Sequence, residues 1–215
     1  GGEILTCEAW HAALMLQPPA EVPALIARLE AHPAERLDWA RATLGLPSLA
    51  PYVAGRRLFP RAQLIHAGVG GAGLQHSPPA LRDEVIAALR EADMVGVRDR
   101  QTLTHLHAAG IPAHLMPDPA VLTAERFGAT IRAHASRGEV AAIGQRFPRG
   151  YLAVQLSADF GDDATLDTLA AQLGEAAAAC DCGIVLFRAG SAPWHDTLDC
   201  LERLAGRLPA ATVQV

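Results

Sequence analysis

Two short apolar runs, each ending abruptly at charged or proline-rich residues, constrain the fold of this chain most strongly. Met94–Val97 stops at Arg98-Asp99-Arg100, and His114–Met116 stops at Pro117-Asp118-Pro119. Between the two runs, residues 100–109 carry leucines at helical spacing and are followed by a glycine. This strand–helix–strand pattern predicts two parallel strands whose carboxyl ends meet at one edge. Open parallel sheets bind their ligands at that edge.

The same alternation of strands and helices runs through most of the chain and predicts an α/β fold with parallel sheets. The first residues, 1–5, look like the end of a strand and its loop. A further helix is expected to begin at Ser77-Pro78-Pro79, with Ser77 as its N-cap. The other strands are expected at residues 63–69, 151–157, 183–189 and 213–215, and the other helices at 8–16, 21–32, 33–44, 164–179 and 194–208.

Residues 126–150 interrupt this alternation, because they hold several glycines and few large apolar side chains. We therefore expect a first Rossmann-like lobe at 1–125, a connection at 126–150 and the start of a second Rossmann-like lobe at 151–215. The second lobe is short for an independent core. The chain also lacks an initiating Met and ends within an apolar run. These features predict a fragment with an incomplete second lobe.

The charge balance limits the kinds of partner. The net charge of −5 provides no basic surface for nucleic acid. All 18 basic residues are arginine. Any anion held by a side-chain cation must therefore be bound by arginine or histidine.

The cysteines, Cys7, Cys180, Cys182 and Cys200, favour a reducing compartment. Four cysteines in a chain of this length do not make a disulfide framework, and one residue between Cys180 and Cys182 is too short a spacing for a zinc knuckle. We expect free thiols and neither a metal nor a cofactor. No apolar stretch reaches the roughly 18 residues of a membrane span, and no signal peptide is visible. The expected location is the cytoplasm, and the oligomeric state stays open.

Arg98 and Arg100 flank a predicted helix start, where free N–H groups and the helix dipole favour phosphate or carboxylate. Gly70 and Gly71 lie in a glycine-rich loop after a strand, and backbone N–H groups there can also point at an anion. Structural alternatives remain for both. Asp99 can cap the helix while the arginines are solvated or paired, and the loop can be a simple turn.

Two further residues are candidates. Asp118 lies between prolines, which favour an extended backbone and fix its carboxylate at the strand end, as a hydrogen-bond acceptor or as a ligand contact. His195 follows a loop after a strand, and histidine is the commonest general acid or base near neutral pH. Its alternative is a structural place in the first turn of the following helix.

Several of these segments together resemble the polysaccharide pyruvyl transferase family. The segment 97–111 and Met116-Pro117-Asp118-Pro119 resemble its central signature, and 63–73 resembles its strand with a glycine loop. Gly1-Gly2 resembles the end of its early glycine run. The segments "YLAVQLS" and "GIVLFRAGSAPWHD" resemble the start of its second lobe.

The resemblance implies a two-lobed fold like that of GT-B glycosyltransferases. It also implies transfer of the pyruvyl unit of phosphoenolpyruvate onto sugar hydroxyls of a cell-surface polysaccharide or its precursor, as a ketal. Arg98 would contact the donor's phosphate or carboxylate, the glycine loop would face the same cleft, and His195 would lie near the acceptor. The partners would be a small-molecule donor and a glycan, and peripheral association with a membrane stays open.

The chain departs from the family pattern at both ends. The family's early glycine/asparagine loop is missing, and its Arg-Leu-His motif would fall beyond Val215. The residues given would then be catalytically incomplete. Two other functions remain open, a nucleotide-sugar glycosyltransferase of the same fold and a non-catalytic relative that binds a sugar or a protein.

Overall fold

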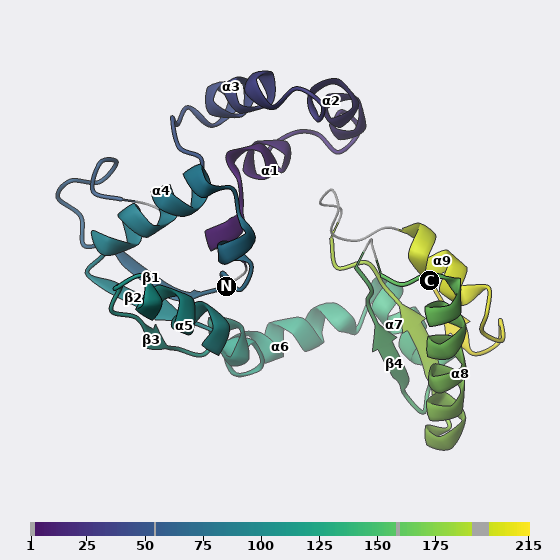
Figure 1. Cartoon of the computed structure of the whole chain (residues 1–215). Coiled ribbons are helices and arrows are strands. Elements are labelled where there is room, and N and C mark those ends of the chain that lie inside the picture. Colours follow the sequence, from purple (N-terminus) through teal and green to yellow (C-terminus); the bar gives the residue numbers. More distant parts are fainter. Residues whose placement is uncertain (1–2, 54, 158–159, 191–197) are drawn as a thin grey trace. The chain divides into compact units, whose positions relative to one another are not determined.

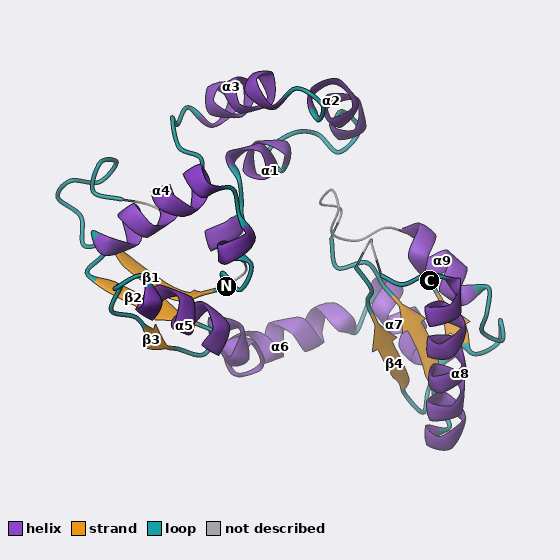
Figure 2. Cartoon of the chain, viewed as in Figure 1, coloured by secondary structure: helices purple, strands orange, loops and turns teal. Residues whose placement is uncertain are grey.

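The computed structural model divides the chain into two compact units, Gly1–Gly128 and Ala129–Val215. It describes all residues except 1–2, 54, 158–159 and 191–197. Each unit contains a three-stranded parallel sheet with helices packed against it (Figures 1 and 2). The prediction of an α/β fold with parallel sheets is confirmed.

The sheet of the first unit has the order β1-β2-β3. Its strands are β1 (Ile65–Val69), β2 (Met94–Val97) and β3 (His114–Leu115). A short 3-10 helix, η2 (Leu74–His76), and then α4 (Pro79–Arg90) connect β1 to β2, and α5 (Arg100–Ala108) connects β2 to β3. Because all pairings are parallel, the three strands end at the same edge.

Apolar side chains of these helices and strands form one buried core. Leu81, Val85 and Leu89 repeat along one face of α4, as the helical spacing predicted. This core also includes Leu5, Val69, Leu74, Val95, Val97, Leu106 and Ile111.

Three helices near the amino end form two further apolar clusters. The helices are α1 (Ala9–Leu14), α2 (Val22–Leu29) and α3 (Pro33–Leu44), and the predicted helices are confirmed within three residues at each end. Trp10 and Trp39 meet edge to face, with ring centroids 5.4 Å apart.

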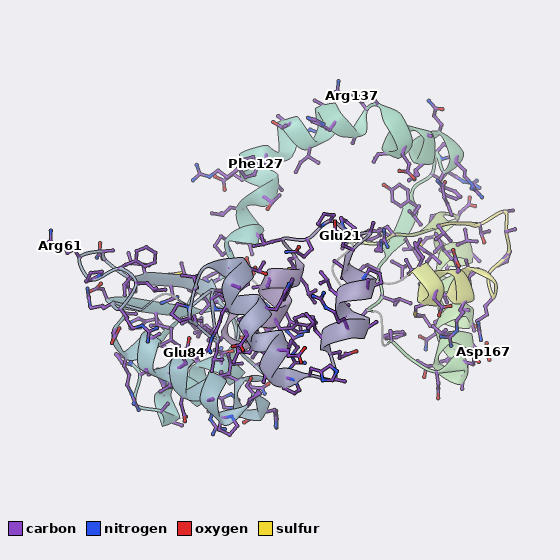
Figure 3. The ribbon with its side chains drawn as sticks, turned by 90° about the horizontal axis from the view of Figure 1, so that it is seen from above. Glu21, Arg61, Glu84, Phe127, Arg137 and Asp167 are labelled. Carbon is purple, nitrogen blue, oxygen red and sulfur yellow. The ribbon has the colours of Figure 1, made fainter. Side chains whose placement is uncertain are left out.

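Helices also occupy most of the segment in which we expected a connection. The short η3 (Pro119–Leu122) leads into α6 (Thr123–Ala135), and α7 (Gly138–Arg146) follows. The boundary between the two units falls inside α6, which has no buried residue. Phe127 on this helix is exposed (Figure 3).

The sheet of the second unit repeats the parallel topology, with the order β4-β5-β6. Its strands are β4 (Tyr151–Val154), β5 (Gly183–Leu186) and β6 (Val213–Gln214). The crossover helices are α8 (Asp163–Cys180) and α9 (Leu198–Ala205). These elements lie within the predicted ranges or within one residue of them.

The two faces of the second sheet are covered differently. Alternate residues of the strands, including Ile184 and Leu186, share a core with α8 and α9. Val185 points to the other face and packs with Ile143 and Phe147 from the α7 region. A Cβ atom at Gly183 would overlap the Phe147 ring, so this strand position requires glycine.

One local prediction was wrong, the N-cap of α4, and the structure adds details at two other places. In the segment expected to be a strand end and its loop, residues 4–6 form a 3-10 turn, η1 (Ile4–Thr6), because Glu3 O accepts both the N–H and the hydroxyl of Thr6. The N-cap of α4 is Pro78, not Ser77, since Pro79 takes the first helical position. Helix α5 ends at Ala108, and Ala109 is its C-cap. Gly110 is the next residue, with a φ of 72° that favours glycine.

Candidate functional site

The carboxyl edge of the first sheet gathers four of the predicted residues. β1 runs into Gly70 and Gly71, β2 runs into Arg98, and β3 is followed by Asp118. The backbone N–H of Arg98 donates to Val69 O at 3.0 Å, which extends the pairing of β1 and β2 by one residue. The edge is therefore where the sequence predicted a ligand site.

The Arg98 guanidinium lies between two carboxylates. Its Nη1 donates to Asp118 Oδ2 at 3.1 Å and its Nη2 to Glu3 Oε1 at 2.8 Å. These hydrogen bonds raise the pKa of Arg98 above its ordinary value, with the bond to Glu3 contributing most. Arg98 is thus a fixed cation, and 29% of its side chain is exposed at the edge.

Asp118 is held by the backbone as well as by Arg98. Its Oδ1 accepts from the N–H of Ala120 at 3.0 Å, at the start of η3. This hydrogen bond, followed by the one from Arg98, lowers the pKa of Asp118. The structure therefore shows Asp118 as a hydrogen-bond acceptor that positions Arg98.

Thr102 ties the glycine loop to α5. The side chain is fully buried, and Oγ1 accepts from the N–H of Gly71 at 2.9 Å. The hydroxyl donates to Asp99 Oδ2, while the Thr102 N–H donates to Asp99 Oδ1, both at 2.7 Å. Asp99 is the N-cap of α5, as the structural alternative predicted. A Cβ atom at Gly71 would lie 2.8 Å from Leu5 Cδ1, so glycine also permits close packing here.

Glu3 joins the loop to Arg98. Its Oε2 accepts from the N–H of Ala72 at 3.0 Å while Oε1 accepts from Arg98. Gln101 Nε2 donates to Ala72 O at 3.0 Å, which fixes the loop from the other side. Two of the loop's N–H groups, those of Gly71 and Ala72, are therefore already engaged.

Of the remaining candidates, the structure describes only Arg100, which takes no part in these contacts. Arg100 is exposed at the first position of α5 and, among the described residues, has no carboxylate within ion-pair distance. His195 lies outside the described residues. His105 and His107 are on α5, where His107 Nε2 contacts Ala113 O at 2.9 Å.

Sequence reasoning missed Glu3 and Thr102. Thr102 could have been found, because it is the third residue after the N-cap Asp99 and its N–H is one that a cap side chain satisfies. Glu3 had no such signal, since it is 95 residues from Arg98 along the chain.

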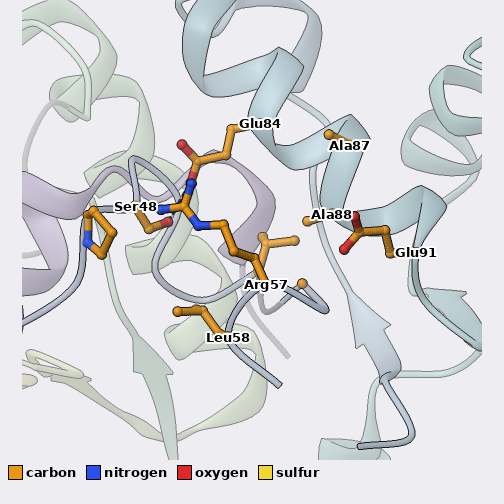
Figure 4. A pocket seen from close by; sticks show the side chains of 10 residues that line it. Ser48, Arg57, Leu58, Glu84, Ala87, Ala88 and Glu91 are labelled. Carbon is orange, nitrogen blue, oxygen red and sulfur yellow. Dashed lines mark hydrogen bonds between the residues drawn. The ribbon is translucent and has the colours of Figure 1, made fainter. Parts of the chain in front are cut away.

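A pocket of 210 Å³ lies between the chain before β1 and the second half of α4 (Figure 4). Glu84 lines it and accepts hydrogen bonds from Ser48 Oγ and the Leu49 N–H. This carboxylate holds the chain around residue 49 in place. Because α4 leads into the start of β2, the pocket lies toward the amino ends of the strands, away from Arg98.

A larger pocket of 390 Å³ lies on the face of the second sheet that α7 covers. Tyr151, Val185, Phe187 and Leu198 line it, with Arg188 and Glu139 as its charged residues. Its lining is mainly apolar, in contrast with the charged edge of the first sheet.

All four cysteines are free thiols, as expected. Burial raises the pKa of the thiols of Cys7 and Cys200, which makes them poor nucleophiles. Within the described ranges, no group of three histidine, cysteine or acidic side chains is arranged to hold a metal ion. No helix in the same part of the chain is both long and apolar enough to cross a membrane.

The comparisons with known proteins point to one family. The family model for polysaccharide pyruvyl transferase matches residues 60–173, more than half of the 215-residue chain. The matched segment contains the glycine loop, Arg98 and Asp118, and contains neither Glu3 nor His195. No curated protein and no solved structure matched the chain.

Proposed function

The chain belongs to the polysaccharide pyruvyl transferase family, a family of transferases, and on this premise we propose that its donor is phosphoenolpyruvate. The pyruvyl unit passes to two hydroxyls of one sugar as a ketal. The acceptor is a cell-surface polysaccharide or its precursor. In this proposal the enzyme works in the cytoplasm, and it contacts a membrane peripherally where the precursor is lipid-linked.

The observation that carries this proposal is Arg98 at the carboxyl edge of the matched sheet. Phosphoenolpyruvate has a phosphate and a carboxylate a few ångströms apart, and such a donor needs fixed cations and N–H groups. Arg98 has five N–H donors, of which two make the hydrogen bonds to Asp118 and Glu3. The guanidinium makes no other hydrogen bond with the described residues, so its remaining donors are available for an anion, whereas the amino end of α5 is already capped by Asp99.

The reaction defines which groups the site must supply. Two sugar oxygens form bonds to the central carbon of the donor, and the bond from that carbon to the phosphate oxygen breaks. One hydroxyl proton ends on the methylene carbon, which becomes a methyl group, and the other leaves with phosphate. An acid and a base are therefore needed, and we assign His195 to proton transfer near the acceptor.

We further propose that the two parallel-sheet units are the lobes of a GT-B-like enzyme. The matched segment begins in the first unit and ends in the second, which supports a shared family architecture. Gly70, Gly71, Arg98, Arg100 and Asp118 would form the first unit's share of the donor site.

A thermal-shift titration with phosphoenolpyruvate, run beside a panel of nucleotide-sugars, tests the donor. A ligand that binds only the folded state raises Tm. We expect a saturable rise with phosphoenolpyruvate alone. A rise with a nucleotide-sugar alone would replace the proposal with glycosyl transfer. No rise with either, in the longest soluble form of the protein, would favour a relative without this activity.

A further inference from the structure

The carboxylate of Glu3 binds two different donors at once. Oε1 accepts from the Arg98 guanidinium at 2.8 Å, and Oε2 accepts from the backbone N–H of Ala72 at 3.0 Å. One donor follows β2 and the other belongs to the loop after β1. The two oxygens of one carboxylate therefore bridge the carboxyl ends of neighbouring strands.

A guanidinium next to a loop N–H is the donor set that proteins use for bound carboxylate and phosphate groups. Here a side chain of the protein occupies it. We propose that Glu3 stands in for the carboxylate of the anionic donor, and that the donor binds by displacing the Glu3 side chain from Arg98 and Ala72. The ligand in this inference rests on the function proposed above, whereas the displacement does not.

The backbone from Glu3 to Thr6 is held by hydrogen bonds and by burial of Leu5, so only the Glu3 side chain needs to move. Leu5 is completely buried and its N–H donates to Gly70 O at 3.2 Å. Thr6 closes the turn through two hydrogen bonds to Glu3 O. By contrast, 47% of the Glu3 side chain is exposed. Rotation into water therefore frees both donors without unfolding η1.

Asp118 is not a second stand-in, because it is fixed at both oxygens. Oδ2 accepts from Arg98, while Oδ1 accepts from Ala120, only two residues away in a turn that begins with Pro119. Asp118 can therefore keep Arg98 oriented while Glu3 leaves. Arg98 is therefore a cation that Asp118 keeps in position and from which Glu3 can be displaced.

The charges agree with an exchange of one anion for another. Glu3, Arg98 and Asp118 together carry one net negative charge, which repels an incoming anion. When Glu3 turns into solvent, the pair of Arg98 and Asp118 is neutral. A donor carboxylate bound in place of Glu3 then restores the single net negative charge and the hydrogen bonds from Arg98 and Ala72.

The test compares Glu3→Gln and Glu3→Ala with the parent protein, and uses Glu30→Gln as the matched control. Glu30 is an exposed residue at the C-cap of α2, outside the cluster. The probes are phosphoenolpyruvate and pyruvate. Calorimetry and NMR titration measure the affinity of each protein for each probe. Because exposed ion pairs contribute about 0.2–1 kcal/mol, both Glu3 variants should bind both probes about 1.5- to 5-fold more tightly. Glu30→Gln should bind them as the parent does.

The outcomes separate this inference from the proposed function. In one outcome the Glu3 variants bind pyruvate more tightly than the parent does, while none of the proteins binds phosphoenolpyruvate better than pyruvate. That result would support the displacement of Glu3 and reject phosphoenolpyruvate as the donor. Unchanged or weaker binding of both probes in both Glu3 variants would overturn the inference, even if the parent binds phosphoenolpyruvate well.

Discussion

The two sheets share one topology and differ at their carboxyl edges. Both are three-stranded, parallel and ordered in sequence. The first edge carries a charged network of Glu3, Arg98 and Asp118. Among the described residues, the second edge presents the exposed apolar side chains of Phe187 and Val215, together with Arg188 and the exposed polar side chain of Gln155 after β4.

The difference shows that topology determines where a site can lie and that the edge residues determine its chemistry. Parallel strands bring separate loops together at one edge in both units. In the first unit the loops deliver a cation, carboxylates and N–H groups, which suit an anion. In the second unit the described edge residues place an exposed apolar ring, that of Phe187, beside polar side chains, which suits a packing partner more than a small anion.

The largest expected effect comes from removing the cation at the first edge. Arg98→Ala should weaken phosphoenolpyruvate binding by about 30-fold or more, because a charge-assisted partner is lost. Tm should change little, since the ion pairs are partly exposed. Calorimetry and a thermal melt measure the two effects, and Arg28→Ala on α2 is the control. Unchanged affinity in Arg98→Ala would remove this residue from the site.

The next effect concerns the packing of the second sheet. Gly183→Ala places a methyl group against the Phe147 ring and should destabilise the protein by about 1–3 kcal/mol. Gly174→Ala is the matched control, because a Cβ atom there meets nothing within 4 Å. In the interior of α8 this change should stabilise the protein by about 0.5–1 kcal/mol. Urea unfolding gives both values. Equal stabilities would show that the close approach to Phe147 is not required.

An effect of similar size is expected where the glycine loop meets α5. Thr102→Val keeps the shape but leaves the buried N–H of Gly71 without its acceptor, at a cost of about 1–3 kcal/mol. Thr104→Val on the same helix loses only an exposed hydroxyl and should change stability much less. The two variants are compared by urea unfolding. A larger loss from Thr104→Val than from Thr102→Val would contradict this role.

The smallest effect is expected between α8 and α9. Arg203 and Arg207 both bind Asp163, and these hydrogen bonds lower the pKa of its carboxyl. A lowered pKa contributes stability that is present above the ordinary carboxyl pKa and is lost as the pH falls through the lowered one. Asp163→Asn should therefore reduce Tm slightly near neutral pH. The difference in Tm between Asp163→Asn and the parent should disappear in acid. Thermal melts from neutral to acidic pH measure it, and a difference in Tm that stays constant over this range would contradict a role for these ion pairs.

Local patterns predicted the elements of the fold well because their causes are local. The leucines of α4 and the proline at the start of α3 act within a few residues. The capping of α5 by Asp99 was also foreseen as an alternative. Ser77 shows the limit, since two adjacent prolines moved the helix start by one position.

The site was only partly predictable because it depends on distant contacts. Arg98 and Asp118 could be paired in advance, since each follows a parallel strand. The partner of Arg98 at the amino end could not, because Glu3 reaches it only through the packing of Leu5 under Gly71. The engagement of the loop N–H groups by Thr102 and Glu3 likewise exists only in the folded chain.

An NMR titration with phosphoenolpyruvate, following backbone amides and arginine side-chain signals, tests the central claim most directly. Our account predicts saturable shifts at Gly71, Ala72 and the Arg98 guanidinium, with the signals of β5 and α8 shifting much less. Saturable shifts confined to the second unit, with those three groups unmoved, would contradict the claim that the first edge binds the donor.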